Sequence, residues 1–203
     1  MPQTTANAAA YLGAALAAAF CLAWPAMAAP TAKAAAVKAA EDKPLLVANF
    51  GDWGVYTSKS GKGKICYTLA QPKTREPSGL NRDPAYAFIS NRPSEGVKNE
   101  PSFIMGFDLM ALDPKKAASP KDAAAAKAAT AMIGDKSFEL FPKGANLWVK
   151  NPAQEPALID EMRKGSKLVV KGASAKGNVT TDSYSLAGFG QALDKVQKDC
   201  AGT

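Results

Sequence analysis

The chain has 203 residues, with 25 lysines and arginines against 18 aspartates and glutamates, no histidine and three cysteines. Without histidine it has no Ser-His-Asp triad, no Cys-His dyad and no His-ligated zinc site. Apolar residues make up 47% of the chain and aromatic residues 8%, which excludes a disordered chain or a membrane protein of many spans and predicts one folded domain.

Residues 1–28 form an alanine-rich segment without charged side chains. It is apolar from Ala8 to Trp24, and Ala26 and Ala28 then have the spacing of a signal-peptide cleavage site. We therefore expect a signal peptide over residues 1–28 and a protein exported to the periplasm, with association with the outer membrane or the cell surface as the alternative location. A transmembrane anchor is the alternative, but the apolar run is shorter than the roughly 20 strongly apolar residues that a span needs.

Composition next separates two low-complexity segments from the predicted domain, which covers residues 44–203. Residues 29–43 consist mainly of Ala, Lys, Pro and Thr, with no apolar face to bury, and predict a flexible tether. Residues 111–131 are rich in Ala and Lys and predict a surface excursion, with a short helix favoured from Asp122. The lysines of this excursion are Lys115, Lys116, Lys121 and Lys127.

Alternating apolar and polar residues predict about eight short strands. The clearest alternation, at Phe103, Met105, Phe107 and Leu109, places large apolar side chains on one face of a strand. The other strands are expected at residues 53–57, 65–70, 86–90, 136–141, 146–150, 167–173 and 180–186, separated by turns rich in Gly and Pro. The pattern indicates an all-β or mainly β domain, built as a sandwich or a barrel-like sheet.

Two segments have helical rather than strand periodicity. The first runs from Glu155 to Lys164, with Pro156 near its start and Gly165 as the predicted residue after its end. The second runs from Gly188 to Cys200 and repeats apolar residues on one face, so that its last cysteine lies on the buried stripe.

Cys66 and Cys200 are the cysteines that remain after the predicted cleavage. In an exported chain two thiols predict one disulfide, and two free buried thiols are the alternative. If Cys66 lies in an early strand, the bond would hold the C-terminal helix against the N-terminal part of the sheet.

Several short motifs, in this order, resemble the invasion-associated locus B (IalB) family of Gram-negative alphaproteobacteria. They extend from Phe50 to Cys200, and each is weak alone. The motifs are Phe50-Gly51-Asp52-Trp53-Gly54-Val55-Tyr56, Lys64-Ile65-Cys66-Tyr67, Asn81-Arg82-Asp83-Pro84-Ala85-Tyr86, Asn91-Arg92-Pro93, Met162-Arg163-Lys164-Gly165-Ser166, Val170-Lys171-Gly172-Ala173-Ser174 and Thr181-Asp182-Ser183-Tyr184-Ser185-Leu186-Ala187-Gly188-Phe189. Many relatives carry a further cysteine where this chain has Thr57, so no second disulfide is transferred.

The resemblance implies a β-rich periplasmic or surface-associated protein, in a family named for a link between one relative and host-cell entry. It does not imply an enzyme, and we expect no cofactor and no metal. We expect a non-catalytic envelope protein that binds an envelope or host-surface partner. A small anionic-ligand binding module and an enzyme that uses carboxylates alone remain as alternatives.

The residues offer a few candidate sites, each with a structural alternative. Arg82, Tyr86 and Arg92 are candidates for binding an anion or a partner, because a guanidinium holds a carboxylate or phosphate through two hydrogen bonds. The alternative is that each arginine forms an ordinary surface ion pair, as Arg82 would with Asp83. Asp182 is expected to be buried and to accept backbone hydrogen bonds.

Asp52 and Trp53 resemble a sugar site, in which a carboxylate stands beside an aromatic ring, but a tryptophan at the start of a strand is more often part of the core. The net charge of +7 points to acidic partners. For an exported protein these are anionic envelope or host-surface components rather than nucleic acid, contacted peripherally and without membrane insertion. The four excursion lysines and the two arginines are the expected contacts.

Overall fold

The computed structural model describes residues 43–61, 63–109 and 129–201. The predicted signal peptide, the tether up to residue 42 and the excursion up to residue 128 lie outside these residues, and so do Asp122 and the four excursion lysines. The predictions made for them stay predictions.

Eleven strands form one antiparallel sheet in the order β1-β2-β3-β5-β6-β9-β8-β7-β10-β11-β4. The mainly β fold class with two helices, one of them C-terminal, is thus confirmed, with more strands than the alternation predicted. The strands are β1 Leu45–Phe50, β2 Trp53–Ser60, β3 Gly63–Ala70, β4 Thr74–Glu76, β5 Tyr86–Arg92, β6 Val97–Ile104, β7 Thr130–Ile133, β8 Lys136–Lys143, β9 Asn146–Val149, β10 Lys167–Ala173 and β11 Val179–Ser185.

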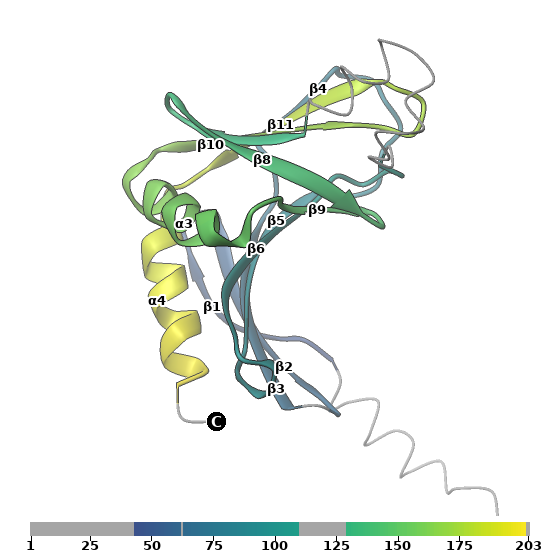
Figure 1. Ribbon diagram of the computed structural model, residues 1–203. Helices are drawn as coiled ribbons and strands as arrows, with labels where there is room; N and C mark the ends of the chain where they lie inside the picture. The colour runs from purple at the N-terminus through teal and green to yellow at the C-terminus, as the bar shows by residue number, and fades with distance from the viewer. Residues whose placement is uncertain (1–42, 62, 110–128, 202–203) are drawn as a thin grey trace, which may run out of the picture.

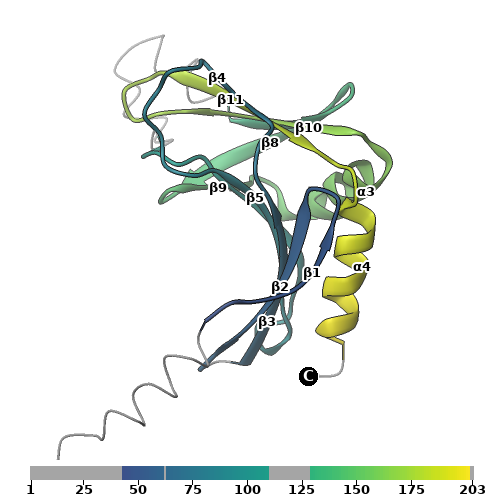
Figure 2. The same cartoon turned by 180° about the vertical axis from the view of Figure 1, so that it is seen from behind.

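The sheet is strongly curved, and both helices lie on its convex side (Figures 1 and 2). Helix α3, Glu155–Lys164, follows a short 3-10 turn, Pro152–Gln154, and helix α4, Phe189–Asp199, runs along β2 and β3. A second 3-10 turn, Pro93–Glu95, joins β5 to β6.

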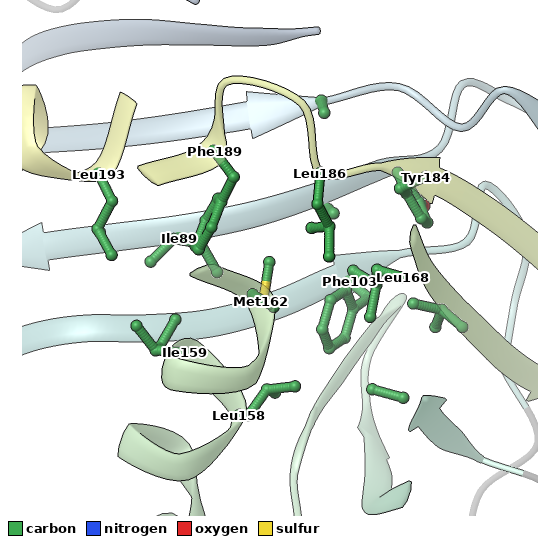
Figure 3. Packing of buried hydrophobic residues seen from close by; sticks show 14 of the residues in the cluster. Ile89, Phe103, Leu158, Ile159, Met162, Leu168, Tyr184, Leu186, Phe189 and Leu193 are labelled. Carbon is green, nitrogen blue, oxygen red and sulfur yellow. The ribbon is translucent and has the colours of Figure 1, made fainter. Parts of the chain in front are cut away.

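The hydrophobic core lies between the helices and the strands that they cover, and it continues between β10 and β9, where a Cβ on Gly172 would lie 3.1 Å from Cδ1 of Leu147 (Figure 3). Alternate residues of the strands point into it, as strand geometry requires. They meet the apolar stripes of α3 (Leu158, Ile159 and Met162) and α4 (Phe189, Ala192, Leu193 and Val196).

Trp53 is part of this core and not of a sugar site. Its side chain has no exposed surface, its ring centroid lies 4.8 Å from that of Phe189, and its Nε1–H donates to the carbonyl of Ser185 at 3.0 Å. Asp52 instead lies on the surface, where it forms an ion pair with Lys73. The core interpretation of Trp53 is therefore confirmed.

The strand around Phe103 lies earlier in the sequence than the alternation predicts, at Val97–Ile104. It ends at Ile104, because Gly106 has a φ of +71° and turns the chain. A Cβ at this position would lie 2.0 Å from the carbonyl oxygen of Asp83, so the close approach also requires glycine. The alternation of apolar residues extends beyond this turn, because Leu109 is buried again and forms an isolated β-bridge with Ser174.

Helix α3 has the predicted bounds, but Gly165 ends it for a different reason than expected. Its φ of −78° and ψ of 168° are extended, so the position needs no left-handed residue. A Cβ there would lie 2.4 Å from Cγ2 of Ile133, and glycine is needed to let β7 pack closely.

Candidate functional site

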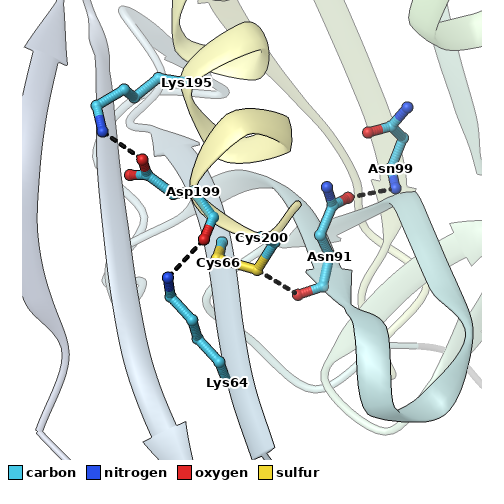
Figure 4. The surroundings of a disulfide bond; sticks show 7 residues. All are labelled: Lys64, Cys66, Asn91, Asn99, Lys195, Asp199 and Cys200. Carbon is cyan, nitrogen blue, oxygen red and sulfur yellow. Dashed lines mark hydrogen bonds and ion pairs between the residues drawn. A yellow bond between two sulfur atoms is a disulfide. The ribbon is translucent and has the colours of Figure 1, made fainter. Parts of the chain in front are cut away.

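Cys66 and Cys200 form a disulfide with a Cα–Cα distance of 6.0 Å, as predicted (Figure 4). Cys66 lies in β3, and Cys200 immediately follows α4. Beside the bond, Lys64 Nζ donates to the carbonyl oxygen of Asp199. The covalent link therefore holds the end of α4 on the N-terminal part of the sheet.

Arg82 is buried, with 5% of its side chain exposed, and it already forms an ion pair. Its Nη1 donates to Oδ1 of Asp182 at 3.0 Å, and that aspartate lies in β11. The neighbouring Asp83 is not its partner, so the expected surface pair between these two residues is wrong. Arg82 lines a surface pocket with Asp83, Asp108 and Lys176.

Asp182 lies between two arginines instead of accepting from backbone donors. Its side chain has no exposed surface, and Arg75 of β4 approaches Oδ2 with its Nε at 3.5 Å. Arg75 also donates to the carbonyl oxygens of Asp83 and Met105. Burial raises the pKa of Asp182, while the charges of the two guanidinium groups oppose this rise.

Arg92, at the end of β5, is shared by two carboxylates. Its Nε lies 2.8 Å from Glu95, and its Nη2 lies 2.8 Å from Glu100. Arg92 also donates to Oγ of Ser90.

The structure does not bring the three predicted anion-site residues together. Tyr86 begins β5 and Arg92 ends it, and this seven-residue strand is about 20 Å long. Tyr86 also lies on the sheet face opposite Ala87 and Ile89, which point into the core. No single pocket therefore combines Arg82, Tyr86 and Arg92.

A different pocket collects lysines around the connection between α3 and β10. It is lined by Glu161 and Lys164 of α3, by Ser166 from the connection, by Lys167 and Lys171 of β10, and by Asp135 of the β7–β8 turn. Lys164 lies 4.0 Å from Glu161, and no ion pair among the described residues involves Lys167 or Lys171. We call Lys164, Lys167 and Lys171 the lysine pocket.

The concave face of the sheet carries an aromatic stack. Tyr56 of β2 and Tyr67 of β3 are paired across the strands, with ring centroids 5.3 Å apart. Phe88 of β5 stacks on Tyr67 at 4.5 Å. Burial raises the pKa of the Tyr67 hydroxyl.

The described residues contain neither a metal-binding cluster nor a helix that could span a membrane. In residues 43–61, 63–109 and 129–201, no three His, Cys, Asp or Glu side chains are grouped so that they could hold a metal ion. None of the helices described in these ranges has the length and apolar character of a membrane span.

Comparison with known protein families gives a match in the carboxyl-terminal part of the domain. The family model described as Invasion associated locus B (IalB) protein matches residues 148–197. The predicted resemblance to the IalB family is confirmed. The matched segment runs from the end of β9 through most of α4 and contains both Asp182 and the lysine pocket of this IalB-like chain.

Among solved structures, the crystal structure of invasion associated protein b from Bartonella henselae is similar to this chain. The sequence identity is 15%, the TM-score is 0.46, and the alignment covers 76% of this chain and 97% of that one. The comparison with curated proteins gave no match.

Sequence reasoning missed Arg75 and the lysine pocket. Arg75 lies in a three-residue strand that is too short to show any alternation. Lys164, Lys167 and Lys171 lie close together in the sequence, but they belong to a helix end and a strand, so no single periodicity places them on one surface.

Proposed function

We propose that this chain is an exported, non-catalytic envelope protein of the IalB type that binds an acidic component of the envelope or of a host surface. The family match supports the IalB type, and the disulfide is consistent with an oxidising compartment.

The lysine pocket is the observation that carries the binding proposal. Lys167 and Lys171 are two residues on either side of Val169 in β10, so all three point to the same face of the sheet. Neither lysine forms an ion pair among the described residues, although Asp135 and Glu161 line the same pocket. The chain as a whole carries a net charge of +7, so its field attracts an acidic surface before contact.

The arginines have a smaller role in this proposal than the sequence suggested. Arg82 is held by Asp182 and Arg92 by two glutamates, so binding an anion would require breaking these pairs. We assign the direct contact to the lysine pocket. Lys115, Lys116, Lys121 and Lys127 keep the proposed role of steering the encounter, since flexible lysines act mainly on association rate.

The test is co-sedimentation with vesicles of phosphatidylglycerol, vesicles of phosphatidylcholine, and lipopolysaccharide. The variant changes Lys164, Lys167 and Lys171 to Gln. With about 1 kcal/mol per lysine near an anionic surface, the three changes should weaken binding to phosphatidylglycerol about 100-fold. Raising salt from about 0.1 M to 1 M shortens the screening length from about 10 Å to about 3 Å and should release the wild type.

A matched control changes Lys59, Lys98 and Lys143 to Gln, which removes the same charge from exposed positions elsewhere. It should weaken binding far less than the pocket variant. A third variant with the four excursion lysines changed to Gln should slow association more than it speeds dissociation. Equal binding to neutral and anionic surfaces, or equal losses in the pocket variant and its control, would contradict the proposal.

A further inference from the structure

The edge strand β1 exposes apolar side chains that no described residue covers. It stands at one end of the sheet and pairs only with β2. Leu45, Leu46 and Val47 are 66%, 47% and 38% exposed. None of its six residues is charged or proline. An exposed apolar edge of this kind is a ready surface for pairing with another strand.

The opposite edge shows the protection that β1 lacks. Strand β4 has only three residues, two of them charged, Arg75 and Glu76, and Pro77 follows it directly. Short length, charge and proline are the features by which edge strands avoid pairing with other chains. The two edges of one sheet therefore differ, and only β1 presents a long uncharged edge.

The charges at the two ends of β1 fit an antiparallel copy of the same strand. Leu45 lies opposite Thr57, and this register continued outward places the exposed Lys43 beside the exposed Lys59. At its other end β1 turns through Asp52, which stays 30% exposed beside Lys73. Antiparallel pairing sets Lys43 of one strand beside the Asp52–Lys73 ion pair of the other and keeps the two lysine ends apart, whereas parallel pairing would bring four lysines together.

We propose that β1 pairs antiparallel with β1 of a second copy of this chain, around a two-fold axis. Such an interface is self-complementary, as closed homodimers require. Leu46 lies opposite Tyr56, whose ring stacks on Tyr67, so the apolar row on the concave face would continue from one copy into the other. Strand pairing alone buries less than a standard interface, so the dimer should be weak and concentration-dependent.

Sedimentation equilibrium of the oxidised exported protein tests this proposal between about 1 μM and 300 μM, a range that brackets a micromolar dissociation constant. The wild type should pass from monomer to dimer within it. Leu46→Lys should raise the dissociation constant at least tenfold, because it places a charge in the pairing edge. Val47→Lys is a second variant with the same expected effect, and circular dichroism checks that each variant is folded.

Leu80→Lys is the matched control. Leu80 is 45% exposed, nearly the same as Leu46, but it lies between β4 and β5 and outside any strand. It should leave the dissociation constant unchanged. If the wild type stays monomeric up to the highest concentration, β1 does not pair with a second copy of this chain. The partner of β1 would then be a strand of a different polypeptide. Equal weakening by Leu80→Lys would overturn β1 as the interface.

Discussion

The carboxylate of Asp182 is fully buried and depends on two arginines from distant parts of the sequence. Arg82 lies one hundred residues before it, and Arg75 comes from the neighbouring edge strand β4, where it is paired with Asp182 of β11. Oδ2 of Asp182 and the hydroxyl of Tyr184 are buried without a hydrogen bond among the described residues. Burial also raises the pKa of Tyr184, and the Asp182 charge adds to this rise. Loss of one arginine would leave the buried Asp182 carboxylate beside one positive charge instead of two.

We therefore expect Arg82→Met to lower the free energy of unfolding by about 3–5 kcal/mol, the usual cost of breaking a buried ion pair. Arg163→Met is the matched control. It breaks an arginine–aspartate pair with Asp194, which is 67% exposed, and should cost less than about 1 kcal/mol. Urea unfolding of the oxidised proteins measures both. Similar losses in the two variants would mean that the Asp182 cluster does not act as a buried ion pair.

Both members of this pair stood out in the sequence, but their contact did not. Arg82 and Asp182 each lie in a motif of polar residues, and local pattern assigns each to a turn or a strand. Their meeting depends on β4 crossing to pair with β11 at the far end of the sheet. Strand order over such distances leaves no periodic trace in the sequence, so the candidate anion site was composed of residues that the fold keeps apart.

At the scale of elements, the helices were predicted more closely than the strands. Helix α3 begins and ends where Pro156 and Gly165 mark its limits, and α4 lies within one residue of its predicted bounds. Strand β1 was missed because its apolar residues do not alternate cleanly with polar ones, and a register shift between Leu46 and Ala48 disturbs the period further. Periodicity thus identifies elements with one buried face and misses exposed edges.

The disulfide carries the second prediction, because it joins two elements that are far apart in the chain. It closes a sequence separation of 134 residues, and in the chain-entropy model a loop of this length is worth about 4–5 kcal/mol. At about 2–4 °C per kcal/mol, reduction should lower the melting temperature by roughly 8–20 °C. Calorimetry with and without reductant measures this, and Cys66→Ala combined with Cys200→Ala should reproduce the reduced value.

The pairing itself can be checked by alkylating the unreduced protein in denaturant. Neither cysteine should react before reduction, and both should react afterwards. Modification of both thiols without reductant would contradict the bond. An unchanged melting temperature would mean that the non-covalent contacts of α4 hold it in place without the bond.

At the scale of the whole molecule, the described fold is a curved sheet with two unlike faces. The convex face is closed by α3 and α4 and contains the core. The concave face carries the aromatic stack, and the lysine pocket opens where α3 leads into β10. Covering one face with helices stabilises the domain and leaves the other face and the β1 edge for contacts with other molecules.

The core of this molecule begins after β1, and the last prediction follows from that boundary. The buried apolar residues of the described chain run from Trp53 to Cys200, while β1 contributes only the partly buried Ala48 and Phe50 to their packing. A variant that begins at Lys43 should therefore melt within about 2 °C of one that begins at Ala29, since substitutions away from the core rarely exceed about 0.5 kcal/mol. A variant that begins at Gly51 should melt several degrees lower, because it loses the hydrogen bonds of β1 to β2 and exposes the core beneath Phe50. Thermal unfolding of the three oxidised proteins decides between these expectations. A large loss on removal of residues 29–42 would show that this segment belongs to the fold and is not a tether.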